Sequence, residues 1–505
     1  MSVGTLISRV LGLVRDVLIM SGFDKAFTDL FVVAFRLPNL FRRLLGEGAL
    51  AVSFVPTYLK LDEKKRTEVS QIMFSFLVVL TSGLVMLGLI YMESVVSLLT
   101  TGSRFQAGSG SFEIVVFYSR VMFGYLFLVT QFAFFMSLLN ANKEFFIPGL
   151  APAFFNLGFI LVLLFPQKSF YVPYDVLAFG VLFGGLLQAS CVIYKAFKMG
   201  LLPKLNFNFR NSHFLKIIVK TLPAMLGLGI AQLMGIINIK LVSGLEGGGL
   251  SAIYLGDRLL ELPQSLIAIS IGTVLLTQLS AKWAEKKWTL FEKDINEAIR
   301  LFLFLALPCA CAFVFYSKPL ISLIFGYGKL GAESILLVSQ ILQLYSVVLI
   351  FNGMNKILIP SFFAAHNTWF PPLTSFLALS VHCVLAYTLS QSSMGVLGVV
   401  LSMSVISVLS FFINFLGFRG LVFKLKLFES FKIGLKLMLP LALMSVFLVQ
   451  VESYSLASSS KIMEIATTTS VILMAAGLYF ISTYFMRLPE CLKLGRALGS
   501  KLFPR

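Results

Sequence analysis

Charged side chains recur inside segments that are otherwise apolar enough to lie in a membrane. The stretch SRVLGLVRD, from Ser8 to Asp16, carries Arg9, Arg15 and Asp16 within a run of leucines and valines. Arginine keeps its charge at physiological pH and binds phosphate through two parallel hydrogen bonds. A lipid-facing arginine costs about 2.5–3.5 kcal/mol even on a lenient scale, so the charged side must face water or protein. The chemistry that this stretch indicates is the binding of an anion.

Helical spacing gathers the polar residues of this stretch on one side. At about 100° per residue, an arc of about 120° holds Thr5, Ser8, Arg9, Gly12, Arg15 and Asp16. Gly12 lies between the two arginines and leaves a notch there. We expect this arc to face away from lipid and the valines and leucines to face it.

A second apolar segment, DLFVVAFRLPNLFRRLLGEGA, also carries charged residues on one helical face. Asp29, Arg36 and Arg43 are seven residues apart and therefore lie nearly on one helical face, with Asn39 and Arg42 close by. Asp29, Arg36, Arg42 and Arg43 extend the charged set of the first segment, and Asn39 adds a neutral amide.

Proline and glycine are expected to shape this second segment. Pro38 removes a backbone hydrogen bond, which predicts a kink. Glu47 lies between Gly46 and Gly48, where we expect the helix to bend or break.

A third charged segment, YLGDRLLELPQ, holds Asp257, Arg258 and Glu261, with Pro263 after them. Arg258 and Glu261 are three residues apart on a helix, so their side chains can pair. This segment would contribute a further cation to an anion site.

Two interpretations of the charged set compete. In the first, the charges pair with one another and only tie helices together. For Asp16, Asp29, Asp257 and Glu261 this interpretation is as good as the second. The set comprises six arginines (Arg9, Arg15, Arg36, Arg42, Arg43 and Arg258) and five acids (Asp16, Asp29, Glu47, Asp257 and Glu261), leaving one positive charge if every acid is paired. Snorkelling at helix ends can account for Arg42 and Arg43. The second interpretation, a cationic cavity between two halves of the protein, explains the set better and predicts an anionic cargo such as a phosphate-bearing lipid or glycolipid.

The elements that carry these residues are membrane-spanning helices. The chain has 505 residues, of which 58% are hydrophobic and 13% are charged, a composition typical of a polytopic membrane protein. With roughly 20 apolar residues per span, about 14 spans are predicted. They fall at residues 3–20, 27–45, 69–91, 112–139, 145–164, 174–197, 214–242, 250–279, 295–316, 335–362, 370–389, 396–418, 431–451 and 465–485. We therefore expect an all-α fold.

Charge in the connections predicts the orientation. Every second connection is rich in lysine and arginine, which places those loops and both termini in the cytoplasm. The formal net charge of +18 fits this distribution. Nucleic-acid binding is disfavoured, because no basic soluble domain exists to carry it.

The sequence contains no motif typical of an enzyme or of a metal-binding protein. The five cysteines lack paired spacing and the three histidines do not cluster, so no metal site is predicted. A phosphate-binding loop, a nucleophile elbow and HExxH are all missing from the sequence. A membrane-embedded enzyme acting on lipid phosphate would need a cluster of acids or histidines such as DDxxD, which the sequence lacks. We expect no cofactor.

An internal repeat predicts two similar halves. LPN at residues 37–39 is echoed by LPQ at 262–264, and ANKEFFIP at 141–148 by AHNTWFPP at 365–372. The two offsets nearly agree, as in transporters built from parallel repeats. The predicted organisation is an N-terminal lobe of six helices at 1–200, a C-terminal lobe of six at 201–420, and two further helices with a cytoplasmic tail at 421–505.

The stretches SRVLGLVRD, AFRLPNLFRRLLGEGALAVSFVP and YLGDRLLELPQ resemble the signature segments of the MurJ (MviN) family. This family comprises lipid II flippases of the multidrug/oligosaccharidyl-lipid/polysaccharide exporter superfamily. The resemblance is specific in the first 60 residues and around the eighth span, and looser elsewhere. It implies alternating access in a multi-pass protein of the bacterial inner membrane, which carries undecaprenyl-diphosphate-linked peptidoglycan precursor from the cytoplasmic to the periplasmic leaflet.

The resemblance also assigns roles to residues. Arg9, Arg15, Arg42 and Arg258 match the essential cavity arginines of the family, and Asp29 matches a required acid. The last two helices would form a groove for the prenyl tail. Lipid II and membrane lipids are the expected partners of a monomer, with other cell-wall synthesis proteins as candidates. A polysaccharide-lipid or multidrug exporter of the same superfamily is the alternative.

One departure from the family concerns energy coupling. Some relatives are thought to bind sodium through acids in their seventh and eleventh helices, whereas residues 214–242 and 370–389 here contain no Asp or Glu. This argues against a sodium site and leaves membrane potential or a proton as the coupling.

Removing sodium is therefore expected to have little effect on transport. The measurement is lipid transport by the reconstituted protein with sodium replaced by potassium at constant ionic strength. A steep dependence on sodium would contradict the interpretation of these two helices.

Overall fold

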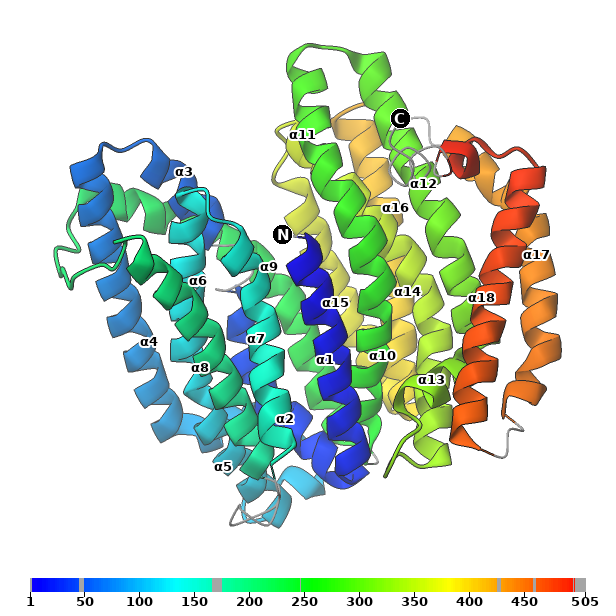
Figure 1. Cartoon of the computed structure of the whole chain (residues 1–505), viewed down its shortest axis with the longest axis horizontal. Helices are drawn as coiled ribbons and strands as arrows, with labels where there is room; N and C mark the ends of the chain where they lie inside the picture. Colours follow the sequence, from blue (N-terminus) through cyan, green and yellow to red (C-terminus); the bar gives the residue numbers. More distant parts are fainter. Residues whose placement is uncertain are drawn as a thin grey trace. The chain divides into compact units, whose positions relative to one another are not determined.

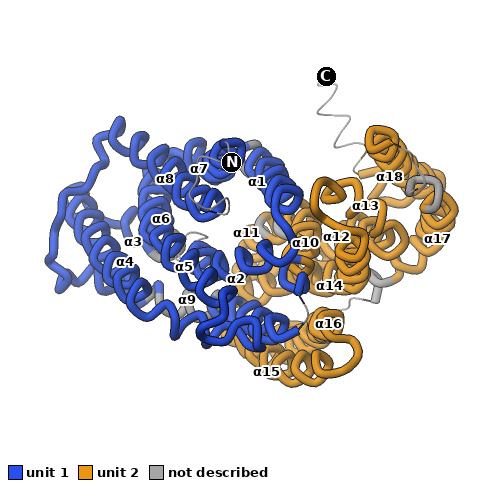
Figure 2. Tube along the Cα trace, turned by 90° about the horizontal axis from the view of Figure 1, so that it is seen from below, with its two compact units in different colours: residues 1–251 blue, residues 252–505 orange. Residues whose placement is uncertain are grey.

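The computed structural model of the protein is helical, and no strand occurs in the part of the chain that it describes (Figure 1). It describes residues 2–44, 50–165, 175–245, 247–424, 428–456, 460–493 and 495. The chain forms two compact units, Met1–Ser251 and Ala252–Arg505, coloured separately in Figure 2. The all-α class predicted from the sequence is confirmed.

Within its described residues, the first unit contains nine α-helices, a short 3-10 turn η2 and the first residues of α10. These elements are α1 (Ser2–Gly22), α2 (Lys25–Phe41), α3 (Leu50–Leu59), α4 (Glu63–Leu99), η2 (Ser103–Phe105), α5 (Gly110–Phe123), α6 (Tyr125–Ala141), α7 (Phe146–Leu163), α8 (Asp175–Lys198) and α9 (Ser212–Ser243). Helix α9 packs on α3 and α4. The compact units thus divide at Ser251, whereas the repeat predicts lobes that divide at residue 200.

The second unit contains most of α10 and the remaining helices. These are α10 (Gly249–Pro263), the π-helical segment η4 (Gln264–Ile269), α11 (Ser270–Ala284), α12 (Trp288–Phe315), α13 (Ser317–Phe325), α14 (Ala332–Ala364), α15 (Phe370–Ser390), α16 (Gly395–Leu421), α17 (Phe428–Leu456) and α18 (Lys461–Phe485). Helices α17 and α18 lie side by side, and α17 packs on α12 (Figure 1).

Eleven helices within the described residues are long and apolar enough to cross a membrane. The other three predicted spans fall on α1, α2 and α9. Helix α1 contains three charged residues, and α2 is 17 residues long. The predicted span at 112–139 is divided at Gly124 into α5 and α6. The count of 14 is consistent with these helices.

Proline widens the helix at corresponding places of the predicted repeat. Pro38 lies inside α2, and a π-helical turn follows at residues 42–44. Pro263 ends α10, and the π-helical segment η4 follows directly. Proline lacks an N–H and its ring clashes with the preceding turn, so the backbone hydrogen bonds rearrange around it. The kink expected at Pro38 thus takes the form of a widened turn.

A second pair of repeated segments also shares its local geometry. Lys143 after α6 and His366 after α14 both adopt a left-handed backbone, with φ of 62° and 61°. The next residue accepts a backbone N–H of the following helix in each case: Glu144 from Phe146, and Asn367 from Phe370. The two turns are therefore similar, with a shift of one residue relative to the aligned motifs.

Glycine allows the close approach of α7 to its two neighbours in the first unit. A Cβ on Gly4 of α1 would lie 2.5 Å from the carbonyl oxygen of Gly149 on α7. A Cβ on Gly184 of α8 would lie 2.5 Å from the carbonyl oxygen of Phe155. Small residues at such contacts let helix backbones pack where lipid provides no hydrophobic driving force.

The core of the second unit joins α12, α14, α16, α17 and α18 through aromatic side chains. Tyr479 of α18 is buried and donates its hydroxyl to the carbonyl of Phe304 on α12, at 2.7 Å. His382 of α15 is buried as well, with Nδ1 3.0 Å from the hydroxyl of Ser402 on α16. These bonds satisfy polar groups that have no access to water.

Replacing Gly184 by alanine is expected to destabilise the first unit by about 1–3 kcal/mol, because α7 and α8 must move apart. Gly83→Ala is the matched control, since Gly83 is helical and a Cβ added there would have nothing within 4 Å. The measurement is thermal unfolding in detergent. Equal melting temperatures for the two variants would contradict the close-packing argument.

Candidate substrate-binding site

The polar arc predicted for α1 lies opposite an exposed apolar face. Leu6, Ile7, Val10 and Val14 are the exposed large side chains of this helix. The charged side chains point away from this face: Arg9 is partly buried, and Arg15 and Asp16 are buried. The predicted amphipathic arrangement of α1 is confirmed.

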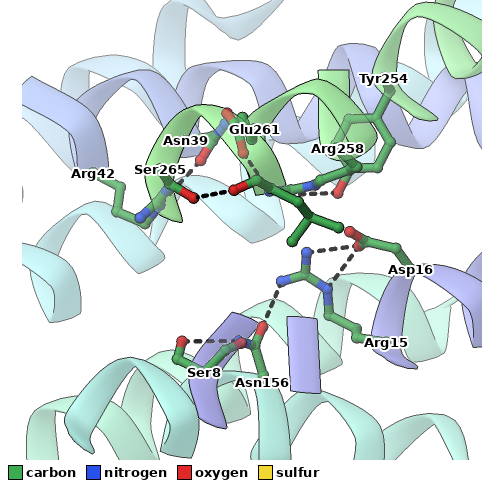
Figure 3. A network of polar contacts seen from close by, with 11 residues as sticks. Ser8, Arg15, Asp16, Asn39, Arg42, Asn156, Tyr254, Arg258, Glu261 and Ser265 are labelled. Carbon is green, nitrogen blue, oxygen red and sulfur yellow. Dashed lines mark hydrogen bonds and ion pairs between the residues drawn. The ribbon is translucent and has the colours of Figure 1, made fainter. Parts of the chain in front are cut away.

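Arg15 and Asp16 form a buried ion pair, drawn in Figure 3. The side chains are 6% and 1% exposed, and Nε and Nη2 of Arg15 donate to Asp16 Oδ1 at 3.1 and 2.7 Å. Nη1 donates to Oδ1 of Asn156 on α7 at 3.0 Å. The guanidinium also lies over the rings of Phe155 and Phe159, 5.7 and 5.4 Å from their centroids. The hydrogen bond to Asn156 and the two aromatic faces therefore hold Arg15 against α7, while Asp16 balances its charge from α1.

Asp29 of α2 holds the start of α10. Its side chain is 2% exposed and accepts the backbone N–H and the hydroxyl of Ser251 at 2.9 and 2.7 Å, together with the N–H of Gly248. Arg104 pairs with the same carboxylate at 3.5 Å and donates to the carbonyl of Ala26 at 2.6 Å. A carboxylate at a helix N-terminus is stabilised by the backbone N–H groups and by the helix dipole. Asp29 thus fixes the α9–α10 turn to α2.

The cations Arg36 of α2 and Arg42 and Arg43 just after it are partly buried. The guanidinium of Arg36 lies against α9, where it occupies the space that a side chain on Gly235 would take. Arg42 donates from Nε to Oδ1 of Asn39 at 3.0 Å (Figure 3). Arg42 and Arg43 both lie in the π-helical turn after Pro38. Glu47 lies outside the described residues.

Arg258 of α10 combines its predicted ion pair with an aromatic contact. It pairs with Glu261 at 3.4 Å, and Nη2 donates to the hydroxyl of Tyr254 at 2.8 Å (Figure 3). The guanidinium carbon lies 4.8 Å from the centroid of the Tyr254 ring. The Arg258 side chain is 24% exposed and Asp257 is partly buried beside it. The expected pairing of Arg258 with Glu261 is confirmed.

Helix α7, which carries Asn156, is fixed at its first turn. Glu144 accepts the backbone N–H groups of Phe146 and Ile147, and Lys195 of α8 pairs with its other oxygen at 2.9 Å. The hydrogen bond from Lys195 holds the pKa of the Glu144 carboxyl below its ordinary value. This carboxylate stays ionised at neutral pH and caps the helix.

Three contributors to these networks were not identified from the sequence: Asn156, Tyr254 and Arg104. Asn156 is a lone amide within the apolar run of α7, and this isolation is the signal that could have identified it. Tyr254 lies one turn before Arg258, and an aromatic residue four positions from a cation is a common helical pair. Arg104 lies in a connection and carries no comparable signal.

The two units present guanidinium groups of different accessibility. Arg15 is buried and bonded on several sides, whereas Arg258 is partly exposed and its ion pair is long. Guanidinium groups bind phosphate oxygens more strongly than neutral donors do, so both can act on an anion. No group of three His, Cys, Asp or Glu side chains suited to a metal ion occurs among the described residues. The guanidinium groups of both units therefore suit the binding of an anion.

The fold and these intramembrane charges define a multi-pass helical membrane transporter. The family model described as lipid II flippase MurJ matches residues 23–486. The chain belongs to this family, and the resemblance seen in its sequence motifs is confirmed.

Curated relatives agree with this assignment. A probable lipid II flippase MurJ of Bdellovibrio bacteriovorus is 36% identical over 396 residues, covering 77% of this chain and 76% of the relative. The lipid II flippase MurJ of Burkholderia cenocepacia is 31% identical over 422 residues, covering 82% of each chain.

Solved structures share the fold. A lipid II flippase MurJ in an inward closed conformation has a TM-score of 0.76 at 23% identity, covering 96% of this chain and 99% of that chain. An inward-facing multidrug resistance MATE family transporter of the MOP superfamily has a TM-score of 0.68 at 14% identity, covering 82% and 94%. The chain therefore shares its fold with these two proteins.

Asp29→Ala is expected to destabilise the protein by about 3 kcal/mol, because it leaves Arg104 and the first turn of α10 without their shared acceptor. Asp62→Ala is the control, since Asp62 pairs with Lys65 on the exposed surface. Thermal unfolding in detergent gives the comparison. If Asp29→Ala melts at the temperature of Asp62→Ala, Asp29 does not hold the turn.

Proposed function

We propose that this protein is a lipid II flippase, which moves undecaprenyl-diphosphate-linked peptidoglycan precursor from the cytoplasmic to the periplasmic leaflet. The observation that carries the proposal is the family match over residues 23–486. The intramembrane arginines Arg9, Arg15, Arg42 and Arg258 agree with it, because the diphosphate of such a lipid is anionic.

The proposed role of the arginines is to bind the diphosphate while it crosses the membrane. A transporter must bind its cargo strongly enough to take it out of water and weakly enough to release it. Arg258 suits exchange, because its 3.4 Å pair with Glu261 is partly exposed and a phosphate oxygen can replace the carboxylate with little rearrangement. Alternating access between the two leaflets would couple this exchange to movement of the lipid.

The setting of this function is the bacterial inner membrane. We propose that both termini are cytoplasmic, since the basic connections alternate along the chain. We further propose a monomer without a cofactor, with α17 and α18 accommodating the prenyl tail and with membrane potential or a proton as the coupling.

A multidrug exporter is the alternative that the shared fold suggests. Cationic drugs would favour acidic binding residues, whereas the arginines here exceed the acids. The lipid carried by a polysaccharide-lipid exporter differs from lipid II in its headgroup, and arginines that bind the phosphates do not distinguish the two headgroups. Transport of defined lipids therefore separates these functions.

Arg258→Ala is expected to abolish rescue of bacteria depleted of their own lipid II flippase, while wild type restores growth and periplasmic exposure of lipid II. Removing this cation takes away a charged ligand of the diphosphate. Arg120→Ala is the matched control, because Arg120 pairs with Glu93 at 3.0 Å on α5 and α4. Each variant is checked for expression and membrane insertion.

Failure of the inserted wild type to move purified lipid II in vesicles would overturn the proposed function. Full rescue by an Arg258→Ala variant would instead overturn the role of that arginine. Movement of another lipid-linked glycan, but not of lipid II, would favour the polysaccharide exporter.

A further inference from the structure

Asn156 lies at mid-length on α7 and uses both ends of its amide to bind α1. The residue is 7% exposed. Its Nδ2 donates to the backbone carbonyl of Ser8 at 2.8 Å, and its Oδ1 accepts from Nη1 of Arg15 at 3.0 Å (Figure 3). The amide therefore bridges two turns of the helix that carries the charged arc.

The glycine notch on α1 receives this amide. A Cβ on Gly12 would lie 3.4 Å from Nδ2 of Asn156, which is at the limit of ordinary contact. Gly4, about two turns earlier on α1, approaches the backbone of Gly149 on α7. Backbone packing thus sets the distance between the helices at which the two hydrogen bonds form.

An amide meets both demands at this position. Oδ1 must accept from a guanidinium and Nδ2 must donate to a carbonyl, and an ionised carboxylate can do only the first. A leucine of similar size can do neither. The side chain at position 156 therefore needs a hydrogen-bond donor and an acceptor, which packing between α1 and α7 alone would not require.

The bond to Asn156 determines which edge of Arg15 remains for an anion. With Nη1 on Asn156, the edge formed by Nε and Nη2 points to Asp16. This is the edge through which a guanidinium binds a phosphate in a bidentate manner. Asp16 therefore occupies the place that a phosphate oxygen would take.

We propose that Asn156 is a positioning residue for Arg15, which orients the Nε and Nη2 edge so that substrate phosphate can exchange with Asp16. The proposal rests on the proposed flippase function, because that function supplies the diphosphate. It assigns to α7 a part in substrate recognition that the charged motifs of α1, α2 and α10 do not reveal.

The test compares Asn156→Leu and Asn156→Asp with the control Gln131→Leu. Gln131 of α6 is a buried amide of the same unit, 4% exposed, and its side chain makes no hydrogen bond within the described structure. The readouts are binding of purified lipid II to the protein in nanodiscs, thermal unfolding, and the rate at which phenylglyoxal modifies Arg15, measured by mass spectrometry.

Asn156→Leu is expected to weaken lipid II binding about tenfold, because a hydrogen bond to a charged group is lost. Asn156→Asp retains the acceptor and is expected to restore part of this binding. Arg15 should react faster with phenylglyoxal in Asn156→Leu than in Gln131→Leu. In the Arg15→Ala background, Asn156→Leu should weaken binding no further.

A merely structural role would lower thermal stability and weaken binding equally in both backgrounds, and this outcome overturns the proposal. Unchanged Arg15 reactivity in Asn156→Leu also overturns it. If wild type does not bind lipid II, the proposed function fails separately, and the reactivity of Arg15 still decides whether Asn156 positions it.

Discussion

The structure depends on one constraint: a charged side chain within a membrane-spanning helix needs polar partners inside the protein. Arg15 shows how the constraint is met, because Asp16 neutralises its charge while Asn156 and two aromatic rings occupy the rest of the guanidinium. Asp29 meets it differently, through backbone N–H groups at the start of α10 and the guanidinium of Arg104. In both cases a partner comes from another part of the chain, so satisfying the charge also fixes the packing of helices.

Backbone geometry makes these partnerships possible. Gly4 and Gly12 let α1 approach α7 closely enough for the amide of Asn156 to reach Ser8 and Arg15. A proline-associated π-helical turn carries Arg42, and a similar one follows α10. Widened turns leave backbone groups and side chains directed away from the regular helical positions, which is why they are frequent at functional sites. Glycines and prolines thus determine where the charged side chains of the apolar segments lie.

The arginines differ in a way that suits transport. Arg15 is fixed by several partners within the first unit, whereas Arg258 has a long, partly exposed ion pair with Glu261 and a contact with Tyr254. A fixed guanidinium defines the orientation of an anion, and a loosely paired one can exchange its carboxylate for phosphate. Under the proposed function both properties would serve transport, since a diphosphate must be bound and then released.

The sequence by itself determined the all-α class, the polar arc of α1 and the pairing of Arg258 with Glu261. Each follows from helical periodicity or from a separation of a few residues, and the motifs around the arginines also indicated the family. The tertiary structure decided that Arg15 bonds to Asn156 on α7 and that Asp29 bonds to Ser251. It also decided that α9 packs with the first unit. These partners lie far apart along the chain, and local periodicity says which face of a helix is polar but not which distant side chain will meet it.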